Sequence, residues 1–108
     1  MDEREDCPYR VILRMEIRPD AAEEFERTWR AVGELIAREP ANLGQVLTRD
    51  VEHPGVYYVV TDWTDEQGFR RFERSEAHVG HRRRLAPYRT GGEMAVTRVV
   101  HDLRGPRA

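Results

Sequence analysis

The sequence contains a single cysteine, Cys7, and no lysine, because all 18 of its basic residues are arginines. One cysteine cannot form an intrachain disulfide, and the chain has no CxxC motif or mixed Cys/His spacing of the kind that holds a metal. The sequence therefore predicts that the protein holds no metal ion and works in a reducing compartment. The exclusive use of arginine is typical of a GC-rich genome, and we draw no mechanistic conclusion from it.

Long apolar runs are also missing. No stretch approaches the roughly 20 apolar residues of a membrane-spanning helix, and the acidic N-terminus does not resemble a signal peptide. A net charge of −2 gives no reason to expect nucleic acid or an anionic membrane as a partner. We therefore expect a cytoplasmic protein that binds neither.

The remaining composition is sufficient for one small domain. With 108 residues, of which 39% are hydrophobic and 35% charged, the chain can bury one modest core. Residues 1–8 lack periodicity and are predicted to form a flexible tail, followed by a domain over 9–103 and a second tail over 104–108. Because so small a domain has much surface for its volume, we expect part of it to be buried against a second copy.

The first predicted elements are a strand and a helix. Residues 9–17 alternate, which places five apolar residues on one face and a mixed set on the other; the mixed set is Arg10, Ile12, Arg14 and Glu16. Asp20 and Glu23 have the spacing of a capping box, which predicts the start of a helix over about 21–38. Apolar residues at spacings of three and four give this helix a buried stripe: Ala22, Phe25, Trp29, Val32 and Ile36.

A hairpin is predicted next. Residues 43–52 alternate as a second strand, and His53-Pro54-Gly55 has the composition of a tight turn. The β-branched and aromatic run from Val56 to Trp63 then forms the third strand.

The chain becomes helical after Trp63. Thr64 and Gln67 have the spacing of a second capping box, in which each side chain satisfies a backbone N–H group. Phe69 and Phe72 lie three residues apart and are predicted to face inward together.

A short helix and a last strand complete the domain. Ser75 is a favourable N-cap for a helix that reaches about Leu85. Gly91-Gly92 is predicted to interrupt the chain before a strand over 93–102.

The predicted order is strand, helix, strand, strand, helices, strand. This order defines the ferredoxin-like βαββαβ arrangement, an α+β fold in which helices cover one face of an antiparallel sheet. The other face, with Arg10, Ile12 and Arg14, is too mixed to lie in water alone. We therefore predict a homodimer that covers this face.

At this point the chain resembles a known family, the antibiotic biosynthesis monooxygenase superfamily of dimeric α/β-barrel proteins. The resemblance lies in an aromatic strand ending in Asp62-Trp63-Thr64-Asp65-Glu66, followed by Phe69, Phe72 and Ser75-Glu76-Ala77-His78. The opening strand running into Arg18-Pro19-Asp20 and the helix with Phe25 and Trp29 add to it. The resemblance spans residues 9–103.

The resemblance implies a pocket between sheet and helices in each subunit and, in the polyketide-tailoring members, a reaction without metal, flavin or haem. A phenolic substrate is deprotonated and its anion reduces O2 directly, so the protein supplies a dry pocket, hydrogen bonds to the phenolate and a group that moves protons. The predicted function is therefore that of a cofactor-independent monooxygenase, which oxidises an anthrone- or naphthol-type polyketide to a quinone in antibiotic biosynthesis.

The candidate catalytic residues are Trp63, His78, His81 and Arg82. The resemblance places Trp63 against a flat substrate, although a core tryptophan at a helix start would have the same sequence pattern. His78, His81 and Arg82 have helical spacings of three and four and share a face with Leu85. Either histidine can carry a proton near neutral pH, and the arginine can hold a phenolate.

The candidate substrate-binding residues are Tyr57, Tyr58, Arg14 and Phe72. The two tyrosines are adjacent on a strand and point to opposite faces, so one of them at most can face a pocket. Arg14, on the mixed face of the first strand, has two alternative roles, in the pocket or at the dimer interface.

Three other functions are weighed against oxidation. Haem degradation, also found in this superfamily, uses an asparagine on the first strand that this chain lacks, and Phe72 stands where the corresponding tryptophan is expected. A polyketide cyclase on the same fold would need no oxygen. The last alternative is a non-catalytic dimeric accessory protein of a biosynthetic pathway.

Overall fold

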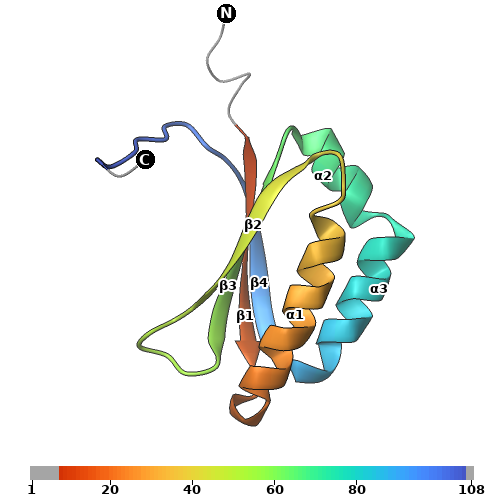
Figure 1. Ribbon diagram of the computed structural model, residues 1–108, viewed down its shortest axis with the longest axis vertical. Helices are drawn as coiled ribbons and strands as arrows, with labels where there is room; N and C mark the ends of the chain where they lie inside the picture. Colours follow the sequence, from red (N-terminus) through yellow and green to blue (C-terminus); the bar gives the residue numbers. More distant parts are fainter. Residues whose placement is uncertain (1–7, 107–108) are drawn as a thin grey trace, which may run out of the picture.

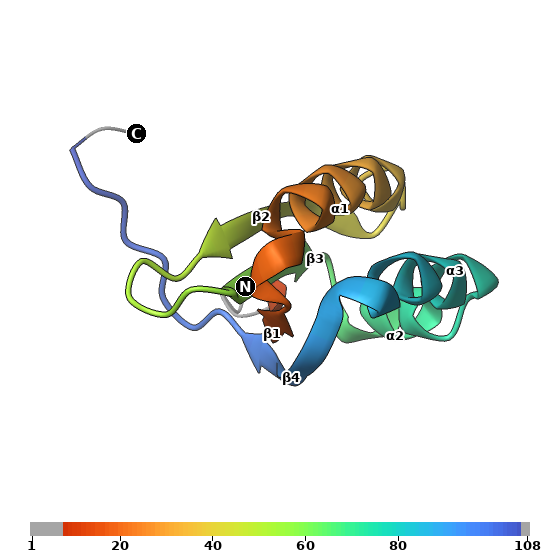
Figure 2. The same cartoon turned by 90° about the horizontal axis from the view of Figure 1, so that it is seen from below.

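The structure, a computed structural model, describes residues 8–106. Four antiparallel strands form one sheet in the order β2-β3-β1-β4, and α1, α2 and α3 lie together on one of its faces (Figure 1, Figure 2). This arrangement confirms the predicted ferredoxin-like α+β fold. Residues 1–7 of the predicted N-terminal tail, which include Cys7, lie outside the described residues.

The central strand is β1 (Tyr9–Ile17), which pairs with β3 (Val56–Trp63) on one side and β4 (Arg89–Arg98) on the other. Its alternation is as predicted, because Val11, Met15 and Ile17 are buried beneath the helices. The first strand therefore supplies the floor on which the helices pack.

Helix α1 (Ala22–Ile36) follows a short 3-10 helix, η2 (Pro19–Ala21). The predicted capping box at its start is wrong. The N-cap residue is Ala21, which has no side-chain hydrogen bond, because η2 places Asp20 before the first α-helical turn. Phe25 and Val32 are buried as predicted.

The predicted hairpin is present, with β2 (Asn42–Arg49) paired to β3. Strand β2 ends earlier than predicted because the carboxylate of Asp50 accepts hydrogen bonds from the backbone N–H groups of Glu52 and His53, at 2.8 and 2.9 Å. These bonds fold the chain into a local turn and end the ladder at Arg49.

Helices α2 (Glu66–Glu73) and α3 (Glu76–Leu85) differ in how well their starts were predicted. The Thr64/Gln67 capping box is wrong: the N-cap of α2 is Asp65, whose carboxylate accepts from the Gly68 N–H at 2.6 Å. At α3 the predicted N-cap is confirmed, since the Ser75 hydroxyl accepts from the His78 N–H at 3.2 Å.

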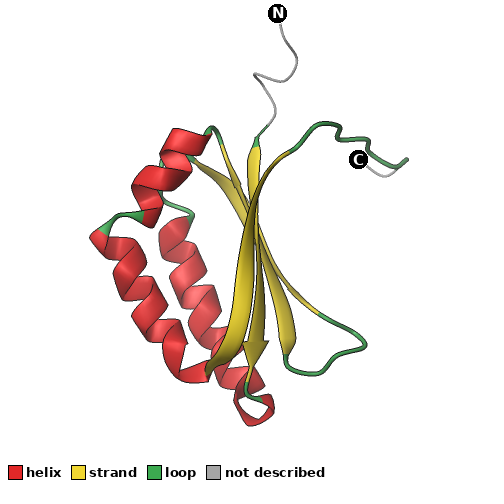
Figure 3. Ribbon diagram, turned by 180° about the vertical axis from the view of Figure 1, so that it is seen from behind, coloured by secondary structure: helices red, strands yellow, loops and turns green. Residues whose placement is uncertain are grey.

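A second 3-10 helix, η3 (Ala86–Tyr88), leads into β4. The last strand begins before the position predicted for it, because Gly91 and Gly92 pair with β1 instead of interrupting the chain. Residues 99–106 follow β4 without regular structure and leave the domain on the side away from the helices (Figure 3).

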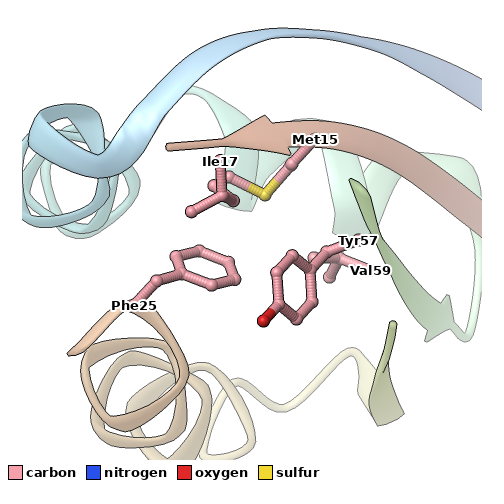
Figure 4. Close-up of a cluster of buried hydrophobic side chains, with 5 residues drawn as sticks. All are labelled: Met15, Ile17, Phe25, Tyr57 and Val59. Atoms are coloured by element: carbon pink, nitrogen blue, oxygen red, sulfur yellow. The ribbon is translucent and has the colours of Figure 1, made fainter. Parts of the chain in front are cut away.

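The helix-facing side of the sheet carries two apolar clusters. Cluster one lies beneath α1, and Figure 4 shows its members together: Met15, Ile17, Phe25, Tyr57 and Val59. Cluster two lies beneath α2 and consists of Val11, Trp63, Phe69 and Phe72. The candidate site lies beside cluster two.

The opposite face of the sheet has no helix over it among residues 8–106. The pairing register places one apolar residue from each strand in a row across this face: Val46, Val60, Ile12 and Ala95. One flanking row contains Arg10 and Asp62, whose side chains form a double hydrogen bond at 2.8 and 3.0 Å. The face is therefore mixed in polarity, as predicted.

Candidate active site

A cavity of about 650 Å³ lies between the sheet and the three helices. Its floor is formed by side chains of β1, β3 and β4: Val11, Leu13, Met15, Val59, Thr61, Trp63 and Met94. Its roof includes Trp29, Val32 and Ile36 of α1, Phe69, Phe72 and Glu73 of α2, and His78, His81, Arg82 and Leu85 of α3. A cavity of this size and apolar character is suited to a small organic molecule.

Helix α3 contributes fewer buried side chains to the core than α1 or α2 does. Helix α1 inserts Phe25 and Val32 into the core, and α2 inserts Phe69 and Phe72. Helix α3 packs against α1 and α2 instead, and its one buried side chain is that of His81. The space under α3 is left open as a result.

Trp63 forms one wall of this space. Its side chain is 1% exposed and contacts Phe69, with ring centroids 5.6 Å apart, and Phe72, with centroids 5.1 Å apart and planes 28° from parallel. The indole N–H donates to the Thr61 hydroxyl at 2.9 Å. Packing and hydrogen bond together hold the ring in one orientation, with almost none of its surface uncovered.

His78 and His81 form the opposite wall, around Phe72. The His78 ring meets Phe72 edge-on at 5.0 Å, and the His81 ring lies nearly parallel to it at 6.1 Å. Burial lowers the pKa of both imidazoles, and nearby arginines, Arg82 for His78 and Arg84 for His81, lower these pKa values further. Because the ordinary pKa is 6.5, both rings are neutral at pH 7 and able to accept a proton.

Arginines surround the part of the cavity nearest the end of α3. Arg82 and Arg83 have no hydrogen-bond or carboxylate partner among residues 8–106, whereas Glu73 is paired with Arg70 at 3.0 Å. Arg89 also lines the cavity, where its Nε donates to the Gly91 carbonyl at 3.2 Å. The unpaired guanidinium groups make this region favourable for an anion.

Five of the eight residues predicted for the site are brought together in this cavity. They are Trp63, Phe72, His78, His81 and Arg82. The two histidines, Arg82 and Leu85, which were predicted to share a helix face, all line the same space.

The structure does not bring the other three, Tyr57, Tyr58 and Arg14, to the cavity. Tyr57 points to the helix side but belongs to cluster one, where its hydroxyl donates to Glu26. Burial raises the pKa of this phenol, as does the Glu26 carboxylate, while Arg49 opposes them.

Tyr58 and Arg14 are register partners on the opposite face of the sheet. The Tyr58 hydroxyl donates to the Asp50 carboxylate at 3.4 Å, and Nη1 of Arg14 lies 3.3 Å from Oε2 of Glu16. Strand alternation therefore settles which tyrosine faces the helices and places Arg14 on the open face.

Sequence reasoning missed Thr61, Trp29, Glu73 and Met94, which also line the cavity. A signal was present for Thr61, because it lies two residues before Trp63 on one strand and must share its face. Trp29 was assigned to the buried stripe of its helix, which is correct but does not distinguish a cavity wall from a core.

Neither a metal site nor a membrane helix is found in the described part of the chain. Among residues 8–106, no three His, Cys, Asp or Glu side chains are placed to hold a metal ion. No helix in the same range is long and apolar enough to cross a membrane.

The fold and the cavity together define a ferredoxin-like α+β domain with an apolar, aromatic-walled cavity between sheet and helices. The sequence profile described as antibiotic biosynthesis monooxygenase matches residues 8–84, and the chain belongs to this family. The resemblance found in the sequence is thereby confirmed.

Similar solved structures agree with the fold. A cofactor-independent oxygenase of Streptomyces nogalater, SnoaB, is 22% identical with a TM-score of 0.80, covering 92% of this chain and 99% of that one. A conserved protein of Methanosarcina mazei is 18% identical with a TM-score of 0.78, covering 88% of this chain and 95% of that one.

A relative is also found by sequence. Protein SchA of Streptomyces halstedii is 24% identical over 92% of this chain, which spans about a quarter (26%) of SchA.

Proposed function

We propose that the chain is a cofactor-independent monooxygenase that oxidises an anthrone- or naphthol-type polyketide to a quinone in antibiotic biosynthesis. The observation that carries the proposal is the composition of one cavity: stacked aromatic rings, two neutral imidazoles and unpaired arginines line the same space. A flat phenol needs these groups for binding, deprotonation and stabilisation as an anion. SnoaB, described as a cofactor-independent oxygenase, has the same fold.

The proposed reaction converts a ring CH2 group and O2 into a ring carbonyl and water. A base takes a proton from the substrate, and the resulting anion passes one electron to O2. The radical pair combines through a new C–O bond, and the resulting peroxide anion takes the proton back from the protonated base to give a hydroperoxide. Loss of the second hydrogen with cleavage of the O–O bond releases water, so one oxygen atom stays in the carbonyl and the other leaves.

Each step has a candidate group in the cavity. Trp63 and Phe72 hold the rings by stacking, and His78 or His81 takes the first proton as a neutral imidazole. Arg82, which is exposed at the edge of the cavity, holds the phenolate through charge-assisted hydrogen bonds. No metal, flavin or haem is required in this scheme, because the substrate anion is the reductant.

The proposed assembly is a homodimer that buries the open face of the sheet. The apolar row of Val46, Val60, Ile12 and Ala95 supports this proposal, since half-exposed valines such as Val46 gain from burial. Tyr58 and Arg14, on the same face, would then lie at the interface. A cytoplasmic location stays a prediction from the cysteine content.

The proposal is tested with metal- and flavin-free protein and an anthrone or a naphthol under air and under argon. We expect O2 uptake equal to quinone formed. His78→Ala should lower kcat by roughly 10²–10⁴-fold, the usual contribution of a general base. His53→Ala, in the exposed hairpin turn, is the matched control and should leave kcat unchanged.

The outcomes separate the alternatives. A product formed equally under argon contradicts oxidation and favours a cyclase. Tight binding of unaltered substrate with no turnover under either gas favours an accessory protein. Equal activity of the His78→Ala and His53→Ala variants removes His78 from the mechanism.

A further inference from the structure

Two hydroxyl groups of the sheet line the cavity, that of Thr61 on β3 and that of Thr90 on β4. The Thr90 hydroxyl already donates to the Glu16 carbonyl at 3.3 Å, and the other lining residues of β1 and β3 are aliphatic, a methionine or Trp63. Thr61 is partly exposed, and it faces the cavity because it shares a strand face with Trp63. A polar group in an otherwise apolar surface determines which atoms a ligand must place there.

The hydrogen bonds of Thr61 are half complete. A threonine hydroxyl can accept and can donate one proton, and here it accepts from the Trp63 indole N–H at 2.9 Å. Its own proton has no acceptor within hydrogen-bonding distance among residues 8–106. The register partner of Thr61 on β2 is Gln45, whose Oε1 has no partner, but Gln45 is held by its Nε2 on the Gly33 carbonyl.

We propose that Thr61 binds the substrate directly, by donating its hydroxyl proton to a phenolic or carbonyl oxygen. The proposal rests on the proposed function, whose substrates are aromatic molecules with such oxygens. The indole N–H fixes the hydroxyl oxygen, so the free proton is already placed before a ligand arrives. Preorganisation of this kind favours affinity because little freedom is lost on binding.

The same contact gives the site its selectivity. An aromatic hydrocarbon without oxygen fits the stacked rings but leaves the Thr61 proton unpaired in an apolar surface, which is unfavourable. A hydroxylated ring supplies an oxygen that accepts the Thr61 proton. Thr61 on the floor and the histidines on the roof would then hold the molecule from opposite sides, and the orientation of the substrate between them is determined.

The test compares 1-naphthol with naphthalene by calorimetry under argon, in wild type, Thr61→Val and Thr61→Ser. Thr61→Val should weaken the binding of 1-naphthol roughly five- to tenfold and change that of naphthalene less than about twofold. Thr61→Ser keeps the hydroxyl and should restore the preference for 1-naphthol. An equal loss for both ligands in Thr61→Val would overturn the proposal.

A second comparison separates direct binding from an effect through Trp63. Thr61→Val leaves the indole N–H without an acceptor and disturbs the ring, whereas Trp63→Phe removes that N–H. In a Trp63→Phe background, Thr61→Val should still weaken 1-naphthol binding roughly five- to tenfold. If it has no effect there, Thr61 acts only as support for Trp63, and the proposal is wrong.

Failure of this inference differs from failure of the proposed function. Binding under argon does not depend on oxidation, so loss of the Thr61 effect with normal O2 uptake in wild type contradicts the inference alone. A Thr61-dependent preference without any O2 uptake contradicts the monooxygenase proposal alone.

Discussion

The two halves of the helix-facing side are built from similar residues and packed very differently. Under α1, Phe25 is fully buried against Tyr57, with ring centroids 4.9 Å apart, and cluster one fills the space. Beneath α2, the aromatic residues of cluster two form the side of a cavity that extends under α3, and Met15 and Val59 at the edge of cluster one line the same cavity. The difference follows from the third helix, which carries histidine and arginine where α1 carries phenylalanine and valine.

The comparison shows that one half of the domain stabilises the fold and the other is available for binding. Close packing in cluster one holds β1 and β3 to α1, which keeps the floor of the cavity in place. In the half under α3, less apolar surface is buried, and the unfilled volume is available for a ligand. Three changes of decreasing expected effect on stability test this division.

The largest effect is expected from truncation in cluster one. Phe25→Ala should lower the free energy of unfolding by about 3–5 kcal/mol, because it leaves a cavity that the surroundings cannot fill. Phe72→Ala, the matched change beside the cavity, should cost only about 2 kcal/mol, since it enlarges an existing space. Urea unfolding at one protein concentration measures both. Equal losses would contradict the division.

A medium effect is expected from enlargement of two residues on β1. Ile17→Phe adds volume to cluster one and should cost about 1–3 kcal/mol. Leu13→Phe points into the cavity and should cost less than about 1 kcal/mol, while weakening the binding of 1-naphthol because the ring occupies the site. Unfolding and calorimetry measure the two quantities. If Leu13→Phe destabilises as much as Ile17→Phe, the space under α3 is closed in solution.

The smallest effect is a pH dependence confined to the half under α3. Burial and Arg84 lower the pKa of His81 in the folded protein, while Glu39 opposes them. The unfolded chain, with an ordinary pKa of 6.5, therefore binds more protons below that pH, and stability falls as the pH drops through and below this value.

Unfolding at pH 7.5 and pH 5.5 tests this dependence. His81→Gln removes one of the two imidazoles whose pKa is lowered and should reduce the loss of stability, and His53→Gln in the exposed turn serves as control. A pH dependence that is unchanged in His81→Gln would show that other groups cause it.

Much of the fold followed from periodicity, whereas local boundaries did not. The alternation of residues 9–17 and the apolar stripe of α1 were sufficient for the topology. Both predicted capping boxes failed because the spacing of side chains does not show which residue leaves helical geometry first. At α2 that residue is Asp65, one position after Thr64.

The candidate site was predicted in part for a related reason. Helical spacing placed His78, His81 and Arg82 together, because i, i+3 and i+4 positions share a face wherever the helix lies. The alternation of side chains along the strand placed Tyr57 and Tyr58 on opposite faces of the sheet, but it did not show that Tyr57 lies in cluster one. The cavity itself depends on how the three helices pack together over the sheet, and no pattern within a single element encodes this arrangement.

The position of β1 has a consequence for the order of folding. Of the four strands described, this one is synthesised first, yet it lies at the centre of the sheet and pairs with β4, the fourth of them in sequence order. Contacts so distant in sequence form slowly, because a long loop must close first. During synthesis β1 can pair with β3 once the hairpin has emerged, but its other edge stays without a partner until residues 89–98 are available. The cavity beside β4 is therefore the last part of this domain to be completed.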